Sequence, residues 1–288
     1  MKGKKWKHAL FCFHKRNFTS EIKIRRNDMG LMICEALLCI LVFFAGACVF
    51  SFLNVIVYRV PKKMSFIKGR SVCPACSHDL GAADLIPISS YIFLKGKCRY
   101  CGGKIGVRDT LTEAAGGAAA LFCALYYGYY GGDYVKAVLI FAFAGVLTVV
   151  ALMDIDTMEI ADGCSVAIVV LAVAGMFLMR EITIGQRLIG MICISVPMLL
   201  LAIVIPGAFG GGDIKLMAAG GLFLGGRMVL ASAVFGILLG GGYGIYLLAS
   251  KKKGRKEQFA FGPFLCAGMI LGLLWGNQMI DWYLGILI

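Results

Sequence analysis

The sequence predicts an all-α protein that crosses a membrane about eight times and carries a small polar insert between its first two spans. Of the 288 residues, 60% are hydrophobic and only 16% are charged, whereas soluble domains average roughly 25% charged residues. Apolar runs of about 17–25 residues, enough to span a bilayer as a helix, recur along the chain. The long polar stretch among them, residues 59–110, contains four cysteines in two closely spaced pairs.

The elements follow from the positions of the apolar runs. Residues 1–28 form a basic arm with nine Lys or Arg, and we expect Met29 to be an alternative start because the organised sequence begins there. Residues 29–58 contain the first span, residues 59–110 the insert, and residues 111–288 the remaining membrane domain. Further spans are expected at about 111–127, 134–153, 164–179 and 188–205, then a short span ending near 224, and spans at 228–249 and from 261 onward.

The net charge of +13 fits membrane topology better than nucleic-acid binding, because Lys and Arg lie mostly in blocks between apolar runs. With eight spans, the loops 59–110, 154–163, 206–215 and 250–260 share one side and contain sixteen Lys or Arg, against four on the other side. The positive-inside rule makes the richer side cytoplasmic. The insert would then face the cytoplasm of an inner-membrane protein, although the basic arm would lie outside, against the rule.

The cysteine pairs of the insert predict a structural zinc site. Cys73 and Cys76 are followed, after twenty-one residues, by Cys98 and Cys101, a spacing typical of a tetrahedral four-thiolate site with no open position for water. A metal would stabilise a stretch of this size, which is small for an independent hydrophobic core. Two disulfides or free thiols are the alternatives, and His78 is a less favoured ligand.

Two aspartates at the edges of apolar runs are the candidate catalytic residues. Asp154 follows one run, and Asp213 follows Gly210, Gly211 and Gly212 before another. A charged side chain costs about 2.5–3.5 kcal/mol at the bilayer centre on insertion scales, so each should face protein or water. Two adjacent carboxylates share one proton and can then act as acid and base on a peptide bond. The pair predicts an aspartyl protease at a membrane face.

Further polar residues near these motifs are candidates for supporting roles. Asn54, inside the first span, either bonds to another helix or positions substrate or a catalytic carboxylate. Asp156 and Asp162 belong to an acidic stretch that is either a solvated loop or attracts a basic peptide, and Asp162 is also a candidate N-cap of the next helix. Lys215 either tunes the aspartate pair or meets lipid phosphates. Gly210 and Gly212 leave the backbone open to close approach.

Several motifs occur in one order: SFLNV at 51–55, YRVP at 58–61, the cysteine quartet, IP at 86–87, KCRYCG at 97–102, Asp154, Asp162, GGGDIKL at 210–216 and FGPFL at 261–265. In these motifs the chain resembles the type IV prepilin peptidases, also called leader peptidase/N-methyltransferases, of the GxGD aspartyl proteases. The resemblance runs from about Met29 to the C-terminus.

The resemblance implies an activity, a substrate class and a second reaction. The basic leader of a prepilin or pseudopilin would be cut at the cytoplasmic membrane face, before a hydrophobic helix, with Asp154 and Asp213 as the catalytic pair. Asp156 and Asp162 match family positions outside that pair. Members with a cytoplasmic cysteine insert also methylate the new N-terminal amine with S-adenosylmethionine, for which this sequence offers no glycine-rich cofactor motif.

Three positions depart from the family pattern. Ala161 stands where Pro usually precedes the aspartate matched to Asp162, Phe50 where Gly precedes the serine of the first motif, and Ala260 where Pro is usual near the last motif. None lies in the aspartate pair, so peptidase activity stays the expectation. Phe50, in the segment of Asn54, leaves substrate positioning open.

Two other functions remain compatible with the residues. Coupled membrane aspartates also serve proton-linked transport, so a transporter or non-catalytic assembly protein with a zinc-stabilised insert is the main alternative. Transporters often contain internal repeats, and none is evident here. A peptidase of the same group acting on another leader class, such as competence pseudopilins, is the second alternative.

Overall fold

The structure, a computed structural model, describes residues 29–73, 75–179, 181–205, 207–250 and 259–287, and the expected basic arm 1–28 lies outside these ranges. Within them the regular elements are helices, with two isolated β-bridges in the insert, so the all-α prediction is confirmed. The helices are α2 (Met29–Arg59), α3 (Ser89–Phe93), α4 (Val107–Cys123), α5 (Tyr134–Thr157), α6 (Asp162–Leu178), α7 (Ile184–Val204), α8 (Gly211–Leu224), α9 (Gly226–Ala249) and α10 (Gly262–Leu287), with a 3-10 turn η1 (Ala82–Asp84) and a π-helical turn η2 (Ala124–Tyr129).

Each of the eight expected spans coincides with one of the longer helices. α2, α5, α7, α9 and α10 are long and apolar enough to cross a membrane, judged by length and composition. α4 and α6 have 17 residues each and α8 has 14, against about 20 for a helix that crosses a typical bilayer. The turn η2 continues α4 directly. The count of eight crossings therefore stays a prediction, while the membrane-protein class is confirmed.

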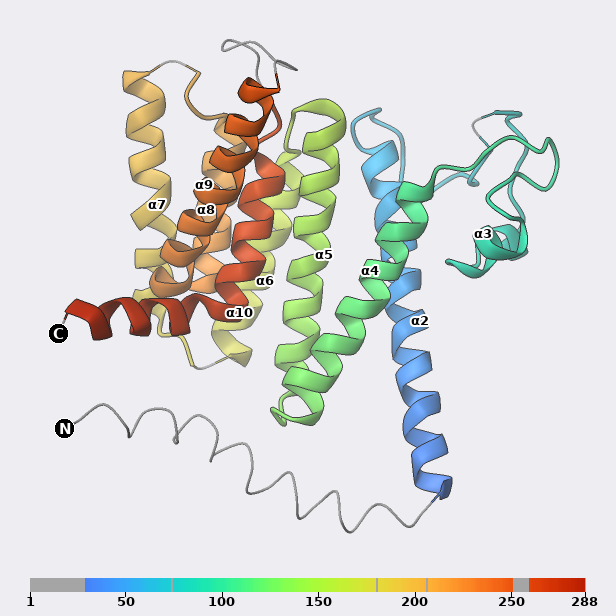
Figure 1. The fold of residues 1–288 in the computed structure, drawn as a ribbon, viewed down its shortest axis with the longest axis horizontal. Coiled ribbons are helices and arrows are strands. Elements are labelled where there is room, and N and C mark those ends of the chain that lie inside the picture. The colour runs from blue at the N-terminus through green and yellow to red at the C-terminus, as the bar shows by residue number, and fades with distance from the viewer. Residues whose placement is uncertain (1–28, 74, 180, 206, 251–258, 288) are drawn as a thin grey trace.

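The helices form two groups that stand side by side. α2 and α4 make an antiparallel pair next to a bundle of α5–α10, and the insert with α3 extends beyond one end of that pair (Figure 1). A Cβ at Gly116 would lie 2.1 Å from Cγ of Phe50, and a Cβ at Gly46 would lie 2.4 Å from Cβ of Ala120. Glycine at these two positions thus lets the backbones of α2 and α4 approach closely, as small residues commonly do between membrane helices.

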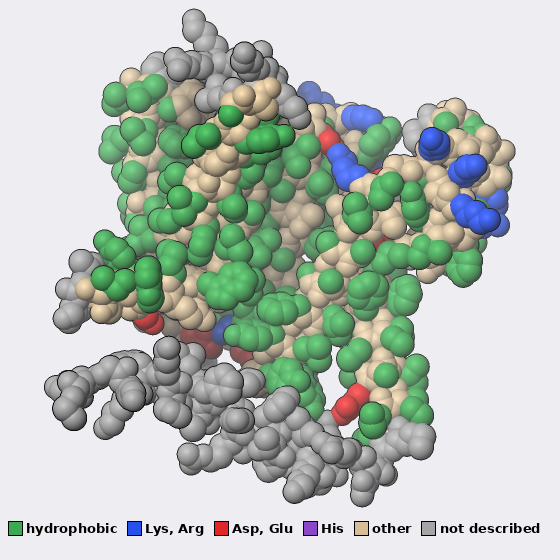
Figure 2. Space-filling model, in the orientation of Figure 1, with side chains coloured by type: hydrophobic (Ala, Val, Ile, Leu, Met, Phe, Trp, Pro, Cys, Tyr) green, Lys and Arg blue, Asp and Glu red, His purple; other side chains and the backbone are tan. Residues whose placement is uncertain are grey.

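The bundle has a continuous apolar core and an apolar outer surface. Inside it, Phe143 of α5 stacks on Phe223 of α8 with 4.2 Å between ring centroids, and Leu147, Leu216 and Met269 are fully buried around them. Hydrophobic side chains also cover the outward faces of the helices, whereas Lys and Arg gather at the insert and the adjoining end of the α2–α4 pair (Figure 2). This distribution is that of a protein whose sides face lipid.

Arg187 is a charged residue that lies among packed helices. Its position between the spans expected at 164–179 and 188–205 predicts a loop, but the structure places it within α7 with its side chain fully buried. Its guanidinium donates hydrogen bonds to the carbonyls of Gly175 and Met179 at the end of α6, and of Leu222 and Phe223 at the end of α8. The last carbonyls of a helix lack intrahelical donors, so Arg187 ties two helix ends together.

Candidate active site and metal centre

One end of the molecule collects the predicted site residues. α2 and α5 end there, and α4, α6, α8 and α10 begin there, close to the insert (Figure 1). Asp154 lies in the last turn of α5, and Asp213 lies in the first turn of α8. The alternation of helix directions therefore brings together two residues that are far apart in the sequence.

Asp154 is held against the start of α10. Its side chain belongs to a residue that is only 6% exposed, and its Oδ2 accepts a hydrogen bond from the backbone N–H of Gly262 at 2.8 Å. A Cβ at Gly262 would lie 2.7 Å from that same oxygen, so a side chain at this position would push the carboxylate away. The free N–H groups at a helix N-terminus also favour a negative charge nearby.

Asp213 is the third residue of α8 and is partly buried. Its Oδ2 accepts a hydrogen bond from the N–H of Gly210 at 3.3 Å, which satisfies one of the free donors before the helix. The neighbouring glycines differ in what they do. A Cβ at Gly212 would lie 3.0 Å from Cβ of Ile160, whereas a Cβ at Gly211 would meet nothing within 4 Å. Gly212 thus allows the start of α8 to approach the segment that follows α5.

The two carboxylates occupy one site. They are close enough for the charge of Asp154 to act on Asp213, and the charges of both act on Cys266, a buried residue one turn into α10. The rings of Phe209 and Phe261, which precede Gly210 and Gly262 respectively, lie with centroids 6.1 Å apart. The segments that carry Asp213 and the donor to Asp154 are therefore neighbours.

Ion pairs flank this site on the exposed side. Arg108, in the first turn of α4, forms a two-pronged pair with Asp156 at 2.6 and 2.9 Å, which joins the α2–α4 pair to the end of α5. Lys215 pairs with Asp162 at 2.7 Å. Asp162 is the first residue of α6, whose N-cap is Ala161, and makes no capping hydrogen bond, so the predicted capping role is wrong.

Asn54 forms hydrogen bonds between α2 and α4. Its Nδ2 donates to the carbonyl of Asp109 at 3.1 Å, and its Oδ1 accepts from the hydroxyl of Thr112 at 2.8 Å. These contacts correspond to the inter-helix alternative for Asn54. The sequence did not predict a role for Arg108 or Gly262. Each bonds to a partner at least 48 residues away, and no local sequence pattern predicts such a contact.

The four cysteines of the insert lie together. The sulfur atoms of Cys73, Cys76, Cys98 and Cys101 are all within 4.8 Å of one another, and those of Cys73 and Cys101 are 4.0 Å apart. Zn–S bonds of about 2.3 Å in a tetrahedron put sulfurs about 3.8 Å apart, so the quartet fits a metal-binding site. His78 instead packs on Tyr100, with ring centroids 3.8 Å apart, and is outside the group.

Side chains around the quartet hold the loops of the insert. The guanidinium of Arg59, at the end of α2, donates to the carbonyls of Ser65, Lys68 and Arg70 at 2.9–3.0 Å. Burial by itself would raise the pKa of Asp84, but hydrogen bonds from Arg99, the N–H of Gly81 and Tyr100 outweigh it and hold that pKa below its ordinary value. The insert is thus fastened to the membrane helix that precedes it.

Comparisons with known proteins agree with this arrangement. The family model described as "Type IV leader peptidase family" matches residues 139–245, and the model "Bacterial Peptidase A24 N-terminal domain" matches residues 44–127. The chain is 31% identical to the "Prepilin leader peptidase/N-methyltransferase" of Bacillus subtilis (strain 168), covering 85% of this chain and 97% of the relative. Relatives of the same name from Aeromonas salmonicida (strain A449) and Pseudomonas aeruginosa are 26% identical, covering 85% and 90% of this chain and 93% and 95% of their own lengths. No solved structure matches the chain significantly.

Proposed function

Because the chain belongs to the type IV leader peptidase family, we propose that it is a membrane aspartyl endopeptidase that removes the basic leader from prepilins or pseudopilins and then N-methylates the new N-terminus. The curated relatives carry both activities in their names. The observation that supports the peptidase most directly is that Asp154, bonded to the N–H of Gly262, and Asp213, bonded to the N–H of Gly210, are held on neighbouring segments at one end of the bundle.

Asp154 and Asp213 are proposed as the catalytic pair. Two carboxylates that act on one water molecule share one proton, because their like charges resist double ionisation. The ionised member takes a proton from water, which attacks the scissile carbonyl, and the protonated member donates a hydrogen bond to the carbonyl oxygen. The N–H groups of Gly262 and Gly210 support this role, since each holds one carboxylate oxygen in place and leaves the other free to reach water.

The flanking residues are proposed to position this pair. The ion pair of Lys215 with Asp162 joins the starts of α8 and α6. Asp156, two residues after Asp154, forms an ion pair with Arg108 of α4. Arg108 and Lys215 neutralise these two aspartates, so Glu159 and the aspartate pair are the carboxylates proposed to attract a leader rich in Lys or Arg. Gly210 and Gly212 contribute through their backbone and their small size, and Asn54 through the α2–α4 contact.

The four cysteines are proposed to hold structural zinc. Thiolates are soft ligands that suit Zn²⁺, and a closed set of four leaves no open coordination position for catalysis. The metal would cross-link the two ends of the insert and stabilise a segment that buries little apolar surface. Zinc therefore supports the insert rather than the peptide cleavage.

S-adenosylmethionine is implied as the methyl donor by the family. Its amine, carboxylate and ribose hydroxyls require polar partners, and the cavity between α2, α4, α5 and α10 is lined almost wholly by apolar side chains. That cavity does not fit this cofactor. The methylation proposal rests on the family alone.

The site is proposed to face the cytoplasm from the inner membrane. Three features meet at this end: the basic insert, the flanking ion pairs and the aspartate pair. The positive-inside rule supports a cytoplasmic location for the basic insert. By the same rule, the basic leader of the substrate would stay on the cytoplasmic side. Prepilins with a hydrophobic N-terminal helix would reach the site from within the bilayer, and lipid surrounds the bundle.

Mass spectrometry of a co-expressed prepilin tests both activities, since leader loss and an added methyl group change the mass separately. We expect Asp154→Asn and Asp213→Asn each to abolish leader loss while the protein still inserts in the membrane. Asp281→Asn is the matched control, because Asp281 is exposed and pairs with Arg227 far along α10 from Gly262. Normal processing by both dyad variants would refute the catalytic assignment and return the transporter alternative.

A further inference from the structure

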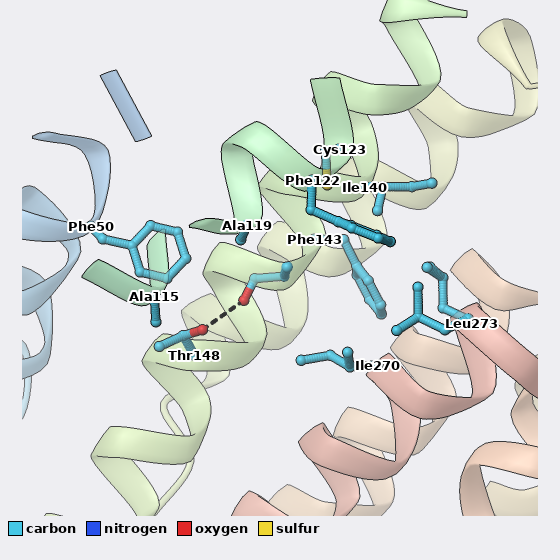
Figure 3. Close-up of a pocket in the computed structure, with 12 residues that line it drawn as sticks. Phe50, Ala115, Ala119, Phe122, Cys123, Ile140, Phe143, Thr148, Ile270 and Leu273 are labelled. Atoms are coloured by element: carbon cyan, nitrogen blue, oxygen red, sulfur yellow. Dashed lines mark hydrogen bonds between the residues drawn. The ribbon is translucent and has the colours of Figure 1, made fainter. Parts of the chain in front are cut away.

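A cavity of about 220 Å³ lies between the α2–α4 pair and the bundle. Side chains from four helices point into it, among them Phe50 of α2, Ala119 and Phe122 of α4, Phe143 of α5 and Leu273 of α10 (Figure 3). It is therefore a space between the two groups of helices.

The lining of the cavity suits a hydrocarbon group. Its hydroxyl belongs to Thr148, and that hydroxyl already donates to the carbonyl of Ala144 in its own helix at 2.9 Å. A polar occupant would leave its donors and acceptors unpaired in this space, which is costly. A cavity of about 150 Å³ accommodates benzene, so this one has room for one large aliphatic or aromatic side chain but not for a whole helix.

The cavity lies deeper along α5 and α10 than the candidate active site. Thr148 and Ile140 precede Asp154 by 6 and 14 residues on α5, which corresponds to depths of about 9 and 21 Å along the helix axis. Phe143 precedes Asp154 by eleven residues and Leu273 follows Gly262 by eleven. Eleven residues are close to three full turns, about 20° out of register. Phe143 and Leu273 thus lie on nearly the same sides of α5 and α10 as Asp154 and Gly262, whereas Thr148, six residues from Asp154, lies about 120° around α5.

We propose that this cavity is a substrate subsite, which receives one large apolar side chain from the hydrophobic helix of the pilin precursor. The inference rests on the proposed function, because it takes the scissile bond to lie at Asp154 and Asp213. A helix that descends from that bond advances about 1.5 Å per residue, so residues roughly 6–14 beyond the cut reach the depth of the cavity. The basic leader at the carboxylates of the site and this side chain in the cavity would set the register of the chain at two points.

Paired variants of α4 test the subsite. Ala119 lines the cavity, whereas its neighbour Ala118 is exposed and outside the lining. The readout is kcat/KM for a full prepilin divided by kcat/KM for a short peptide that contains the scissile bond but stops about five residues after it, before the residues that would reach the cavity. We expect Ala119→Trp to lower this ratio about tenfold or more, because the burial of one large side chain is lost, and Ala118→Trp to leave it unchanged. An unchanged ratio in Ala119→Trp overturns the subsite while leaving the peptidase intact, whereas a wild-type protein that cuts neither substrate overturns the proposed function.

If Ala119→Trp does not fold, photo-crosslinking tests whether the pilin helix reaches the cavity. Benzoylphenylalanine replaces Phe122, which lines the cavity, or Ala118 as the control, in membranes that contain a prepilin. We expect the probe at position 122 to capture the pilin within about 6–14 residues after the cut, and the probe at position 118 to capture lipid. Capture of lipid alone at position 122 would show that an acyl chain fills the cavity, and the proposal would be wrong.

Discussion

Because α7 and α8 cross closely, adding one methyl group at the crossing should lower both the stability and the activity of the protein. Gly190 and Gly221 face each other so closely that a Cβ at Gly221 would lie 2.1 Å from the carbonyl oxygen of Gly190, and a Cβ at Gly190 would lie 2.3 Å from the carbonyl oxygen of Gly221. The obstructing atoms are backbone in both directions, so no side chain can rotate out of the way. Gly221→Ala therefore has to separate the two helices.

The size of the effect follows from the distance. Ordinary contact begins at 3.4 Å, so a Cβ at 2.1 Å requires a movement of about 1.3 Å. Overpacking of this kind costs about 1–3 kcal/mol, partly offset by the higher helix propensity of Ala, worth up to about 1 kcal/mol. With the full propensity gain, we expect Gly221→Ala to lower the free energy of unfolding by about 0–2 kcal/mol relative to wild type, and by about 1–3 kcal/mol relative to a glycine-to-alanine change that meets no atom. Asp213 lies eight residues earlier on α8, so leader cleavage should fall as well, by up to about 100-fold if the carboxylate moves by 1 Å.

The assay is unfolding in detergent micelles together with prepilin cleavage at a temperature where both proteins are folded. Gly241→Ala on α9 is the matched control, because a Cβ at Gly241 meets nothing within 4 Å, and it should be neutral or slightly stabilising. Equal stability and equal activity of Gly221→Ala and Gly241→Ala would refute the close crossing of α7 and α8.

Three further predictions concern the buried Arg187, the cysteine cluster and the exposed Arg108–Asp156 ion pair. Arg187→Met removes the donor shared by the ends of α6 and α8 and should destabilise the bundle by about 1–3 kcal/mol for each buried carbonyl left without a partner. Unfolding measures this loss, and a wild-type midpoint would contradict the proposed clamp. Metal analysis should give about one zinc per chain, and Cys98→Ser should abolish binding and expose residues 59–110 to protease before the bundle; protease resistance equal to wild type would argue against a structural metal. Arg108→Ala breaks a pair with Asp156 whose side chains are 49% and 36% exposed, so stability should change by less than about 1 kcal/mol, and a larger loss would mean that the pair is not solvent-screened.

Two of the departures from the family pattern have structural explanations. Ala161 precedes α6 with φ −63°, a value that proline also adopts, so either residue fits the same backbone. Phe50 is 3% exposed, packs on Gly116 and Phe141, and lines the cavity between the helix groups. Its bulk therefore affects the proposed subsite rather than the hydrogen bonds of Asn54.

The sequence by itself determined the class of the protein and most of its chemistry. Long apolar runs predicted the helices, since each run is a local property of consecutive residues. The spacing of the four cysteines predicted their cluster, because two short loops ending in thiols close on one metal with little dependence on the rest of the fold. Asp154 and Asp213 were identifiable because a carboxylate at the edge of an apolar run is costly unless it has a partner.

The contacts that shape the site were decided only by the tertiary structure. The N–H of Gly262 reaches Asp154 across 108 residues, Arg108 reaches Asp156 across 48, and Arg187 is buried between α6 and α8 instead of lying in a loop. Every residue except proline has a backbone N–H, so the sequence does not show which N–H binds a carboxylate. Nor does it show whether an arginine contacts water, a carboxylate or the end of a helix. The cavity between the helix groups likewise arises from how four helices pack, which no single run of residues encodes.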